Sequence, residues 1–130
     1  MAYLIDTNIA IYARDGSDPI LSKLAEHVDD VLLSALSLAE LLRGVHGSSS
    51  DATRRASRLE TLLRSIPVLP FDEHAAREYG AIIARCGWVR GRDSDRMIAG
   101  HALATGSILV TNNVSDFRDI PDLTLENWIT

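Results

Sequence analysis

Short apolar runs alternate with longer segments of helical periodicity along the 130 residues of the chain. Four runs are short enough for buried strands, at 2–5, 31–34, 67–71 and 107–113, and a fifth candidate lies at 122–128. Between them, apolar residues recur every three or four positions and predict helices at 7–14, 18–28, 36–47, 51–66, 72–86 and 93–106. This alternation predicts the α/β class, in which helices cover both faces of a parallel sheet.

Polar residues mark where several of these helices begin and end. Asp18 is placed as an N-cap with Pro19 at the first helical position, and Ser37 with Glu40 matches the S-x-x-E capping box. The segment "GSSSD" at 47–51 predicts a turn between two helices. The ends of the helices are therefore predicted as well as their existence.

Composition indicates an ordinary globular chain. Apolar residues make up 46% of it and charged residues 24%, and no internal repeat divides it, so we expect one domain spanning 1–130. No segment has the roughly 18 to 20 consecutive apolar residues of a membrane helix, and we expect a cytoplasmic protein with no membrane partner. Cys86 is the single cysteine, and the four histidines show no zinc spacing.

The net charge of −5 argues against broad, non-specific attraction to nucleic acid. However, 12 of the 13 basic residues are arginine, with Lys23 the only lysine. Arginine is the residue suited to bidentate contacts with phosphates and carboxylates. A local basic patch is therefore compatible with the acidic total.

Four acids lie near the ends of the predicted strands. Asp6 ends the first strand, Glu40 follows the second, and Asp95 and Asp116 lie before and after the fourth. Because ligands of parallel sheets bind beyond the carboxyl ends of the strands, we expect these carboxylates to converge there. Clustered carboxylates need a cation, and hard oxygen ligands suit Mg²⁺ or Mn²⁺. Such a metal activates water for phosphodiester hydrolysis, which indicates a nuclease.

Each acid also has a structural interpretation. Asp6 before a helix is as typical of an N-cap as of a ligand, and Glu40 fits the capping box. Asp93 and Asp95 both suit the N-terminus of a helix, and Asp116 suits a turn. These interpretations do not predict that acids from four segments fall at one end of one sheet.

Arginines near the acids are candidates for contacts with phosphates, although a solvated surface is the alternative for each. They are Arg14, Arg43, Arg90, Arg92 and Arg96. Trp88 lies in a predicted loop, where it is a candidate for stacking on a base, for packing or for binding a partner.

Several stretches of the chain together resemble PIN-domain ribonucleases, most closely the toxins of VapBC-type toxin-antitoxin pairs. They occur in order as "YLIDTNIAIY", "SALSLAELLRG", "DSDRMIAGHALATGSILVTNNVSDF" and "IPDLTLENW". The resemblance implies a three-layer α/β/α fold around a parallel sheet of four to five strands. It also implies a Mg²⁺- or Mn²⁺-dependent endoribonuclease that cuts RNA, with tRNA or rRNA as candidate targets. A cognate antitoxin as inhibitor and a homodimer are further implications.

The resemblance carries over residue by residue. It implies that Asp6, Glu40 and Asp95 are the metal ligands, with Asp116 as a further catalytic acid. Many members of the family carry an acid near the second asparagine of "TNN", where this chain has Asn113 and then Asp116 three residues later. Supporting or second-metal positions are then Asn113, Asp116, Thr7, Asn8 and Asp93.

Two other functions compete with the ribonuclease. A non-catalytic interaction module of the same fold would use the acids only as helix caps. A phosphoacceptor domain of the receiver type also has a parallel α/β pattern and acids after its first strand. It needs a lysine after the last strands, whereas Lys23 lies far upstream.

Overall fold

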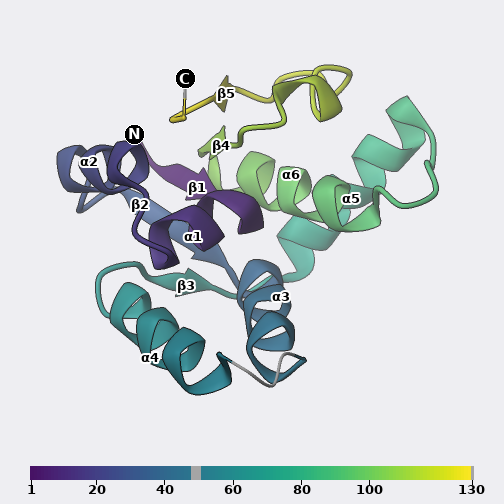
Figure 1. The fold of residues 1–130 in the computed structure, drawn as a ribbon. Coiled ribbons are helices and arrows are strands. Elements are labelled where there is room, and N and C mark those ends of the chain that lie inside the picture. The colour runs from purple at the N-terminus through teal and green to yellow at the C-terminus, as the bar shows by residue number, and fades with distance from the viewer. Residues whose placement is uncertain (48–50, 130) are drawn as a thin grey trace.

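The structure is a computed structural model that describes residues 1–47 and 51–129 (Figure 1). Its strands are β1 (Tyr3–Ile5), β2 (Val31–Ser34), β3 (Val68–Leu69), β4 (Ile108–Val110) and β5 (Leu125–Glu126). Its helices are α1 (Thr7–Arg14), α2 (Asp18–Glu26), α3 (Ala35–His46), α4 (Ala52–Leu63), α5 (Glu73–Cys86) and α6 (Asp93–Thr105), followed by the short 3-10 helix η1 (Val114–Asp116). The turn predicted at 47–51 lies mostly outside the described residues.

The five strands form one parallel sheet in the order β3-β2-β1-β4-β5. In the central strand, Leu4 is paired with Leu32 of β2 and with Leu109 of β4. The strands are short apolar runs because both faces of a parallel sheet are covered by helices. The predicted parallel sheet is confirmed, and β5 supplies its fifth strand.

Side chains that alternate along β1 enter two separate cores. Ile5 packs in a cluster formed with residues of α1, α2, α3 and α4, whereas Leu4 packs in a cluster with residues of α5 and α6. The helices therefore form two layers around the sheet, and the three-layer α/β/α fold is confirmed (Figure 1). No helix within the described ranges is long and apolar enough to cross a membrane.

Two predicted helix starts were wrong in detail. In α2 the N-cap residue is Ser17, so Asp18 is the first helical residue and Pro19 the second. The α3 helix begins at Ala35 directly after β2, and the Ser34 hydroxyl accepts the Leu36 N–H at 3.1 Å. Ser37 therefore lies inside the helix, and the capping box with Glu40 does not form.

Two strands are shorter than predicted. Only Val68–Leu69 of the 67–71 run is a strand, because the prolines on either side lack the N–H that a sheet ladder needs. The strand predicted at 107–113 ends at Val110, and the following Thr111 hydroxyl accepts the Asn113 N–H in a turn. The polar residues of "TNN" therefore lie just beyond the carboxyl edge of the sheet.

Candidate active site

Asp6 lies at the junction of β1 and α1, at the carboxyl edge of the sheet. Its Oδ1 accepts the Ile9 N–H at 2.9 Å, which makes it the N-cap of α1. The side chain is buried. A carboxylate at such a position loses the hydration that stabilises its charge. The capping role is confirmed, and it accounts for one of the two carboxylate oxygens.

The electrostatic surroundings of Asp6 connect it to two other acids. Burial is the main reason that its pKa is raised, and the nearby charges of Asp95 and Glu40 raise it further. Hydrogen bonds from the Thr111 hydroxyl and the Ile9 N–H lower the pKa, because they favour the charged form. Three carboxylates, from the β1–α1 junction, α3 and α6, are therefore close enough to repel one another.

Glu40 reaches the same place from the second turn of α3. Its Oε1 accepts hydrogen bonds from the Thr7 hydroxyl and the Ser94 hydroxyl, each at 2.9 Å. The Ser37 hydroxyl lies 3.0 Å from that of Thr7 and extends the network. These hydroxyls hold the carboxylate between the N-terminal ends of α1 and α6.

Asp95 is in the first turn of α6, where the helix N-terminus favours negative charge. Its pKa is nevertheless raised, first by burial and then by the charges of Asp116 and Glu40, while Arg92 and Arg96 oppose the shift. Asp116 ends η1 and forms an ion pair with Arg92 at 3.6 Å.

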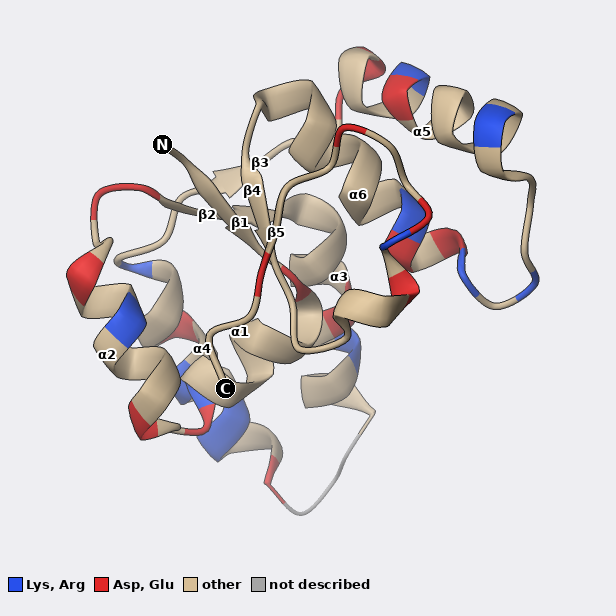
Figure 2. Cartoon of the chain, turned by 90° about the horizontal axis from the view of Figure 1, so that it is seen from above, with Lys and Arg blue, Asp and Glu red and all other residues tan. Residues whose placement is uncertain are grey.

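Three of the four acids, Asp6, Glu40 and Asp95, line a polar pocket of about 510 Å³, which we call the acid pocket. Its wall consists of Asp6, Thr7, Asn8, Ile11, Glu40, Arg43, Gly44, Gly47, Asp95 and Ile98. Figure 2 shows acidic segments alongside α3 and at the start of α6. The acid pocket brings together the predicted triad and three of the predicted neighbours, Thr7, Asn8 and Arg43.

The donor chemistry of the acid pocket suits a hard divalent cation, because carboxylate oxygens are its preferred ligands and the added charge would offset their repulsion. Within residues 1–47 and 51–129, however, no group of three or more His, Cys, Asp or Glu side chains is arranged to hold a metal ion. The triad thus shares a pocket and an electrostatic field without forming a closed set of ligands.

Several predicted site residues lie elsewhere. Asp93 accepts hydrogen bonds from the Tyr79 hydroxyl and the Trp88 indole N–H, both at 2.9 Å, and so joins α5 to α6. Arg96 is buried and donates to Asp119 at 2.7 Å, so it is not available to an external phosphate. Neither residue lines the acid pocket, and the choice of Asp95 over Asp93 agrees with this arrangement.

Arg14 and Asn113 also lie outside the acid pocket. Arg14 pairs with Asp15 at 3.1 Å and lines a different, apolar groove. Asn113 is exposed at the start of η1, whereas Asp116 is the residue whose charge acts on Asp95. Neither Asn113 nor Asp116 lines the acid pocket.

Comparison with known proteins identifies the fold family. A family model of the PIN domain matches residues 3–123. The chain belongs to the PIN-domain family. It is 35% identical to Ribonuclease VapC2 of Rickettsia felis and 31% identical to the tRNA(fMet)-specific endonuclease VapC of Salmonella typhimurium, with 98% of both partners covered in each comparison. Within the family it therefore groups with the VapC ribonucleases.

Solved structures of related PIN domains agree with this assignment. The complex of VapBC2 from Rickettsia felis bound to a promoter DNA fragment contains a chain with a TM-score of 0.87 and 33% identity, covering 98% of this chain and 99% of that one. DNA-bound VapBC from Salmonella typhimurium gives a TM-score of 0.87 at 30% identity, with 98% coverage of both chains.

Two residues of this PIN-domain site escaped the sequence-based prediction. Thr111 lowers the pKa of Asp6, and Ser94 donates to Glu40. The position of Thr111 directly after β4, beside Asp6 at the end of β1, is a signal that was available. Ser94 lies between the two aspartates of "DSD" and was hidden by them.

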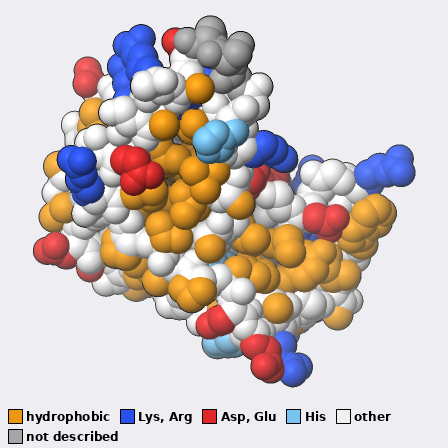
Figure 3. Space-filling model, turned by 90° about the horizontal axis from the view of Figure 1, so that it is seen from below, with side chains coloured by type: hydrophobic (Ala, Val, Ile, Leu, Met, Phe, Trp, Pro, Cys, Tyr) orange, Lys and Arg blue, Asp and Glu red, His pale blue; other side chains and the backbone are white. Residues whose placement is uncertain are grey.

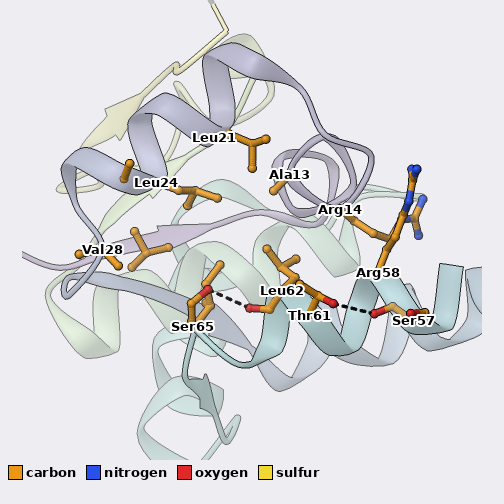
Figure 4. A pocket seen from close by; sticks show the side chains of 13 residues that line it. Ala13, Arg14, Leu21, Leu24, Val28, Ser57, Arg58, Thr61, Leu62 and Ser65 are labelled. Atoms are coloured by element: carbon orange, nitrogen blue, oxygen red, sulfur yellow. Dashed lines mark hydrogen bonds between the residues drawn. The ribbon is translucent and has the colours of Figure 1, made fainter. Parts of the chain in front are cut away.

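The PIN domain also has an apolar groove between α2 and α4, next to α1 (Figure 4). It measures about 380 Å³, and the side chains of Leu21, Leu24, Val28 and Leu62 are among those that line it. Leu21 is 42% exposed and Val28 is 54% exposed, which is unusual for large apolar residues. We call this hollow the α2–α4 groove.

Proposed function

We propose that this chain is the toxin of a toxin–antitoxin pair and a divalent-cation-dependent endoribonuclease. The observation that carries the proposal is the convergence of Asp6, Glu40 and Asp95, from three separate segments, on the acid pocket. Relatives named as ribonucleases or endonucleases match the chain over nearly its whole length, which supports an RNA substrate. The VapBC complexes among the similar structures support a protein antitoxin as its partner.

The three acids of the pocket would hold Mg²⁺ or Mn²⁺ as the resident ion. A divalent cation bound there lowers the pKa of a coordinated water and supplies a nucleophile at neutral pH. Asp6 has one oxygen fixed by the Ile9 N–H, so its carboxylate is oriented before an ion arrives. The Thr7 and Ser94 hydroxyls orient Glu40 in the same way.

Other residues have proposed roles around this centre. We propose that Asp116, whose negative charge acts on Asp95, supports a second cation. Arg43 lines the acid pocket, and Arg92 is partly exposed next to Asp116. We assign these two arginines to the phosphates that flank the scissile bond.

The antitoxin is proposed to bind in the α2–α4 groove, because the exposed apolar side chains there would be buried by a partner.

A homodimer is also proposed, through the side of the molecule that carries α3 and β3. Leu42 of α3 and Val68 of β3 are exposed there. Figure 3 shows hydrophobic side chains gathered over a broad area of the lower face.

Cleavage of RNA by the purified protein tests the ribonuclease. We expect cleavage with Mg²⁺ or Mn²⁺ and none with EDTA. In Asp6→Asn the cleavage rate should fall about 100-fold or more, because an ion that loses this ligand would no longer supply its several kcal/mol of transition-state stabilisation. Asp93→Asn is the matched control, since it neutralises a neighbouring acid that lies outside the pocket. Native rates in Asp6→Asn would refute the proposed site.

A non-catalytic interaction module is the second candidate, and the absence of a closed set of metal ligands among the described residues favours it. Calorimetric titration with Mn²⁺ separates the two functions. Saturable binding that is lost in Asp6→Asn supports the nuclease, whereas no binding and no RNA cleavage support the module. A receiver-like role has no support, because Lys23 lies on α2 and pairs with Glu26 at 3.7 Å.

A further inference from the structure

Three arginines near the N-terminal end of α4 form a basic surface outside the acid pocket. Arg54, Arg55 and Arg58 line a polar hollow of about 230 Å³ together with Asp15 and Asp51. Figure 2 shows the basic segments of α4. Arg54 and Arg58 are four residues apart on one helix, where like charges repel. We call the three arginines the α4 arginine patch.

Three other arginines that the sequence offered for phosphate contacts each lie beside an aspartate. Their pairs are Arg14–Asp15 at 3.1 Å, Arg92–Asp116 at 3.6 Å and Arg96–Asp119 at 2.7 Å. Within the part of the chain that the structure describes, no residue of the α4 arginine patch has an ion-pair partner within 4.0 Å. The charge of the patch is therefore available to an external anion.

The α4 arginine patch is continuous with the acid pocket. Arg55 Nη1 donates to the Gly44 carbonyl at 3.4 Å. Gly44 lines the acid pocket, as does the neighbouring Arg43. The α4 helix packs beside α3, which carries Glu40 and Gly44 of the acid pocket.

We propose that the α4 arginine patch binds phosphates of the RNA substrate beside the scissile bond, an inference that rests on the proposed ribonuclease function. The chain has a net charge of −5, so beyond the ion proposed for the acid pocket, attraction for the phosphodiester backbone has to come from cations next to the pocket. Guanidinium groups bind phosphates bidentately. Arg58 also lines the α2–α4 groove, but Arg54 and Arg55 do not, and the contact of Arg55 with Gly44 of the acid pocket favours RNA over an acidic segment of a protein partner.

The test measures RNA binding in Asp6→Asn chains, which are expected not to cleave the probe. Fluorescence anisotropy of a labelled single-stranded RNA is recorded over a range of salt concentrations. The test variant adds Arg54→Gln and Arg55→Gln, and the matched control adds Arg64→Gln and Arg118→Gln, two exposed arginines outside the patch. Losing two phosphate contacts reduces the salt slope by about 1.4, which corresponds to an affinity roughly 25-fold lower at 0.1 M salt.

The outcomes separate this proposal from the proposed function. A salt slope that is smaller in the test variant but not in the control supports the patch, even if the wild type cleaves no RNA. Equal slopes in both variants, or no RNA binding by the Asp6→Asn parent at low salt, overturn it. A test variant with an unchanged slope but weakened binding to the antitoxin assigns the patch to the protein partner and also overturns it. Cleavage by the wild type is measured separately.

Discussion

Asp6 combines two roles that the sequence alone presents as alternatives. The N-cap bond to Ile9 uses Oδ1, while the charge of the group interacts with Asp95 and Glu40. Because asparagine is as good an N-cap as aspartate, the two roles can be separated by substitution. A side chain that keeps the acceptor and loses the charge should preserve α1 and abolish the site.

We therefore predict opposite effects for two substitutions of Asp6. In EDTA, Asp6→Asn should melt at or above the wild-type temperature, because a buried charge that faces two others is removed. Asp6→Ala should lose about 0.5–2 kcal/mol, since the Ile9 N–H loses its acceptor. Thermal melts with and without Mn²⁺ measure both, and only the wild type should gain stability from the ion. Equal Mn²⁺ stabilisation of Asp6→Asn would contradict the ligand role.

His101 of α6 is a buried titratable side chain that contacts β2. Its Nδ1 lies 2.8 Å from the Ser34 hydroxyl, which itself accepts the Leu36 N–H. Either group can donate in this contact, depending on the tautomer of His101. Burial lowers the pKa of His101 below its usual 6.5, and the charge of Asp72 opposes the shift only partly.

This arrangement predicts that acid destabilises the fold through His101. The unfolded chain takes up a proton as pH falls through about 6.5 while the folded chain does not, so stability is present above that pH and declines below it. Urea unfolding at several pH values between about 5 and 8 measures the slope. His101→Asn keeps a polar group beside Ser34 and should show a shallower decline, and parallel curves for the two proteins would contradict the assignment.

At the scale of elements, α5 and α6 are held unusually close at Gly100. A Cβ atom added there would lie 2.7 Å from the Tyr79 nitrogen and 3.2 Å from the Ala75 carbonyl oxygen. Both are backbone atoms of α5, so they cannot move aside as a flexible side chain can. Glycine at this position permits the packing of the two helices that places Asp95 at the start of α6.

Gly100→Ala should therefore destabilise the fold by about 1–3 kcal/mol, despite the better helix propensity of alanine. Gly80→Ala on α5 is the matched control, because none of the described atoms lies within 4 Å of its added Cβ apart from the helix itself. That substitution should stabilise the fold by up to about 1 kcal/mol. Chemical unfolding measures both, and equal effects of the two substitutions would show that the close approach is unimportant.

Periodicity was sufficient to predict the helices and strands of the sheet. The ends of the helices were harder to predict, because neighbouring residues compete for the N-cap position. Ser17 and Asp18 are both good N-caps, and only the fold selects Ser17. The capping-box pattern at Ser37 failed because Ser34, the last residue of β2, already caps α3. Local patterns list the candidates, and the length of the preceding strand decides among them.

Convergence of the acids was predictable for the same reason that the sheet was. Asp6 follows a central strand, and the carboxyl edge of a parallel sheet collects the residues that follow its strands. Spacing gives the angle between two side chains on a helix, but it does not say which of them faces the acid pocket. Asp93 and Asp95 are about 200° apart around α6, so one turns to Tyr79 and Trp88 and the other to the acid pocket. Arg96 turns inward for the same geometric reason.

At the scale of the whole molecule, the acid pocket and the α2–α4 groove are different surfaces with different chemistry. The first is lined by acids and hydroxyls, and the second by Leu21, Leu24, Val28 and their neighbours. Two helices link the two surfaces. In α1, Arg14 lines the groove and Thr7 lines the pocket, and in α4, Leu62 lines the groove while Arg55 donates to Gly44 of the pocket. Substitutions in the groove should therefore alter antitoxin binding without altering the catalytic residues.

We predict that Leu21→Asp and Val28→Asp each weaken the antitoxin complex while RNA cleavage continues. Both side chains are partly exposed in the isolated chain, so a carboxylate there costs little folding free energy. Losing the burial of one such side chain in the complex removes about 1.5–3 kcal/mol, which is roughly a 10- to 150-fold weaker affinity. Titrating cleavage activity with the antitoxin measures the effect, because the variants need more antitoxin for the same inhibition. Val89→Asp, at a similarly exposed apolar residue outside the groove, is the control. Inhibition of the groove variants at the control's antitoxin concentration would place the antitoxin elsewhere on the molecule.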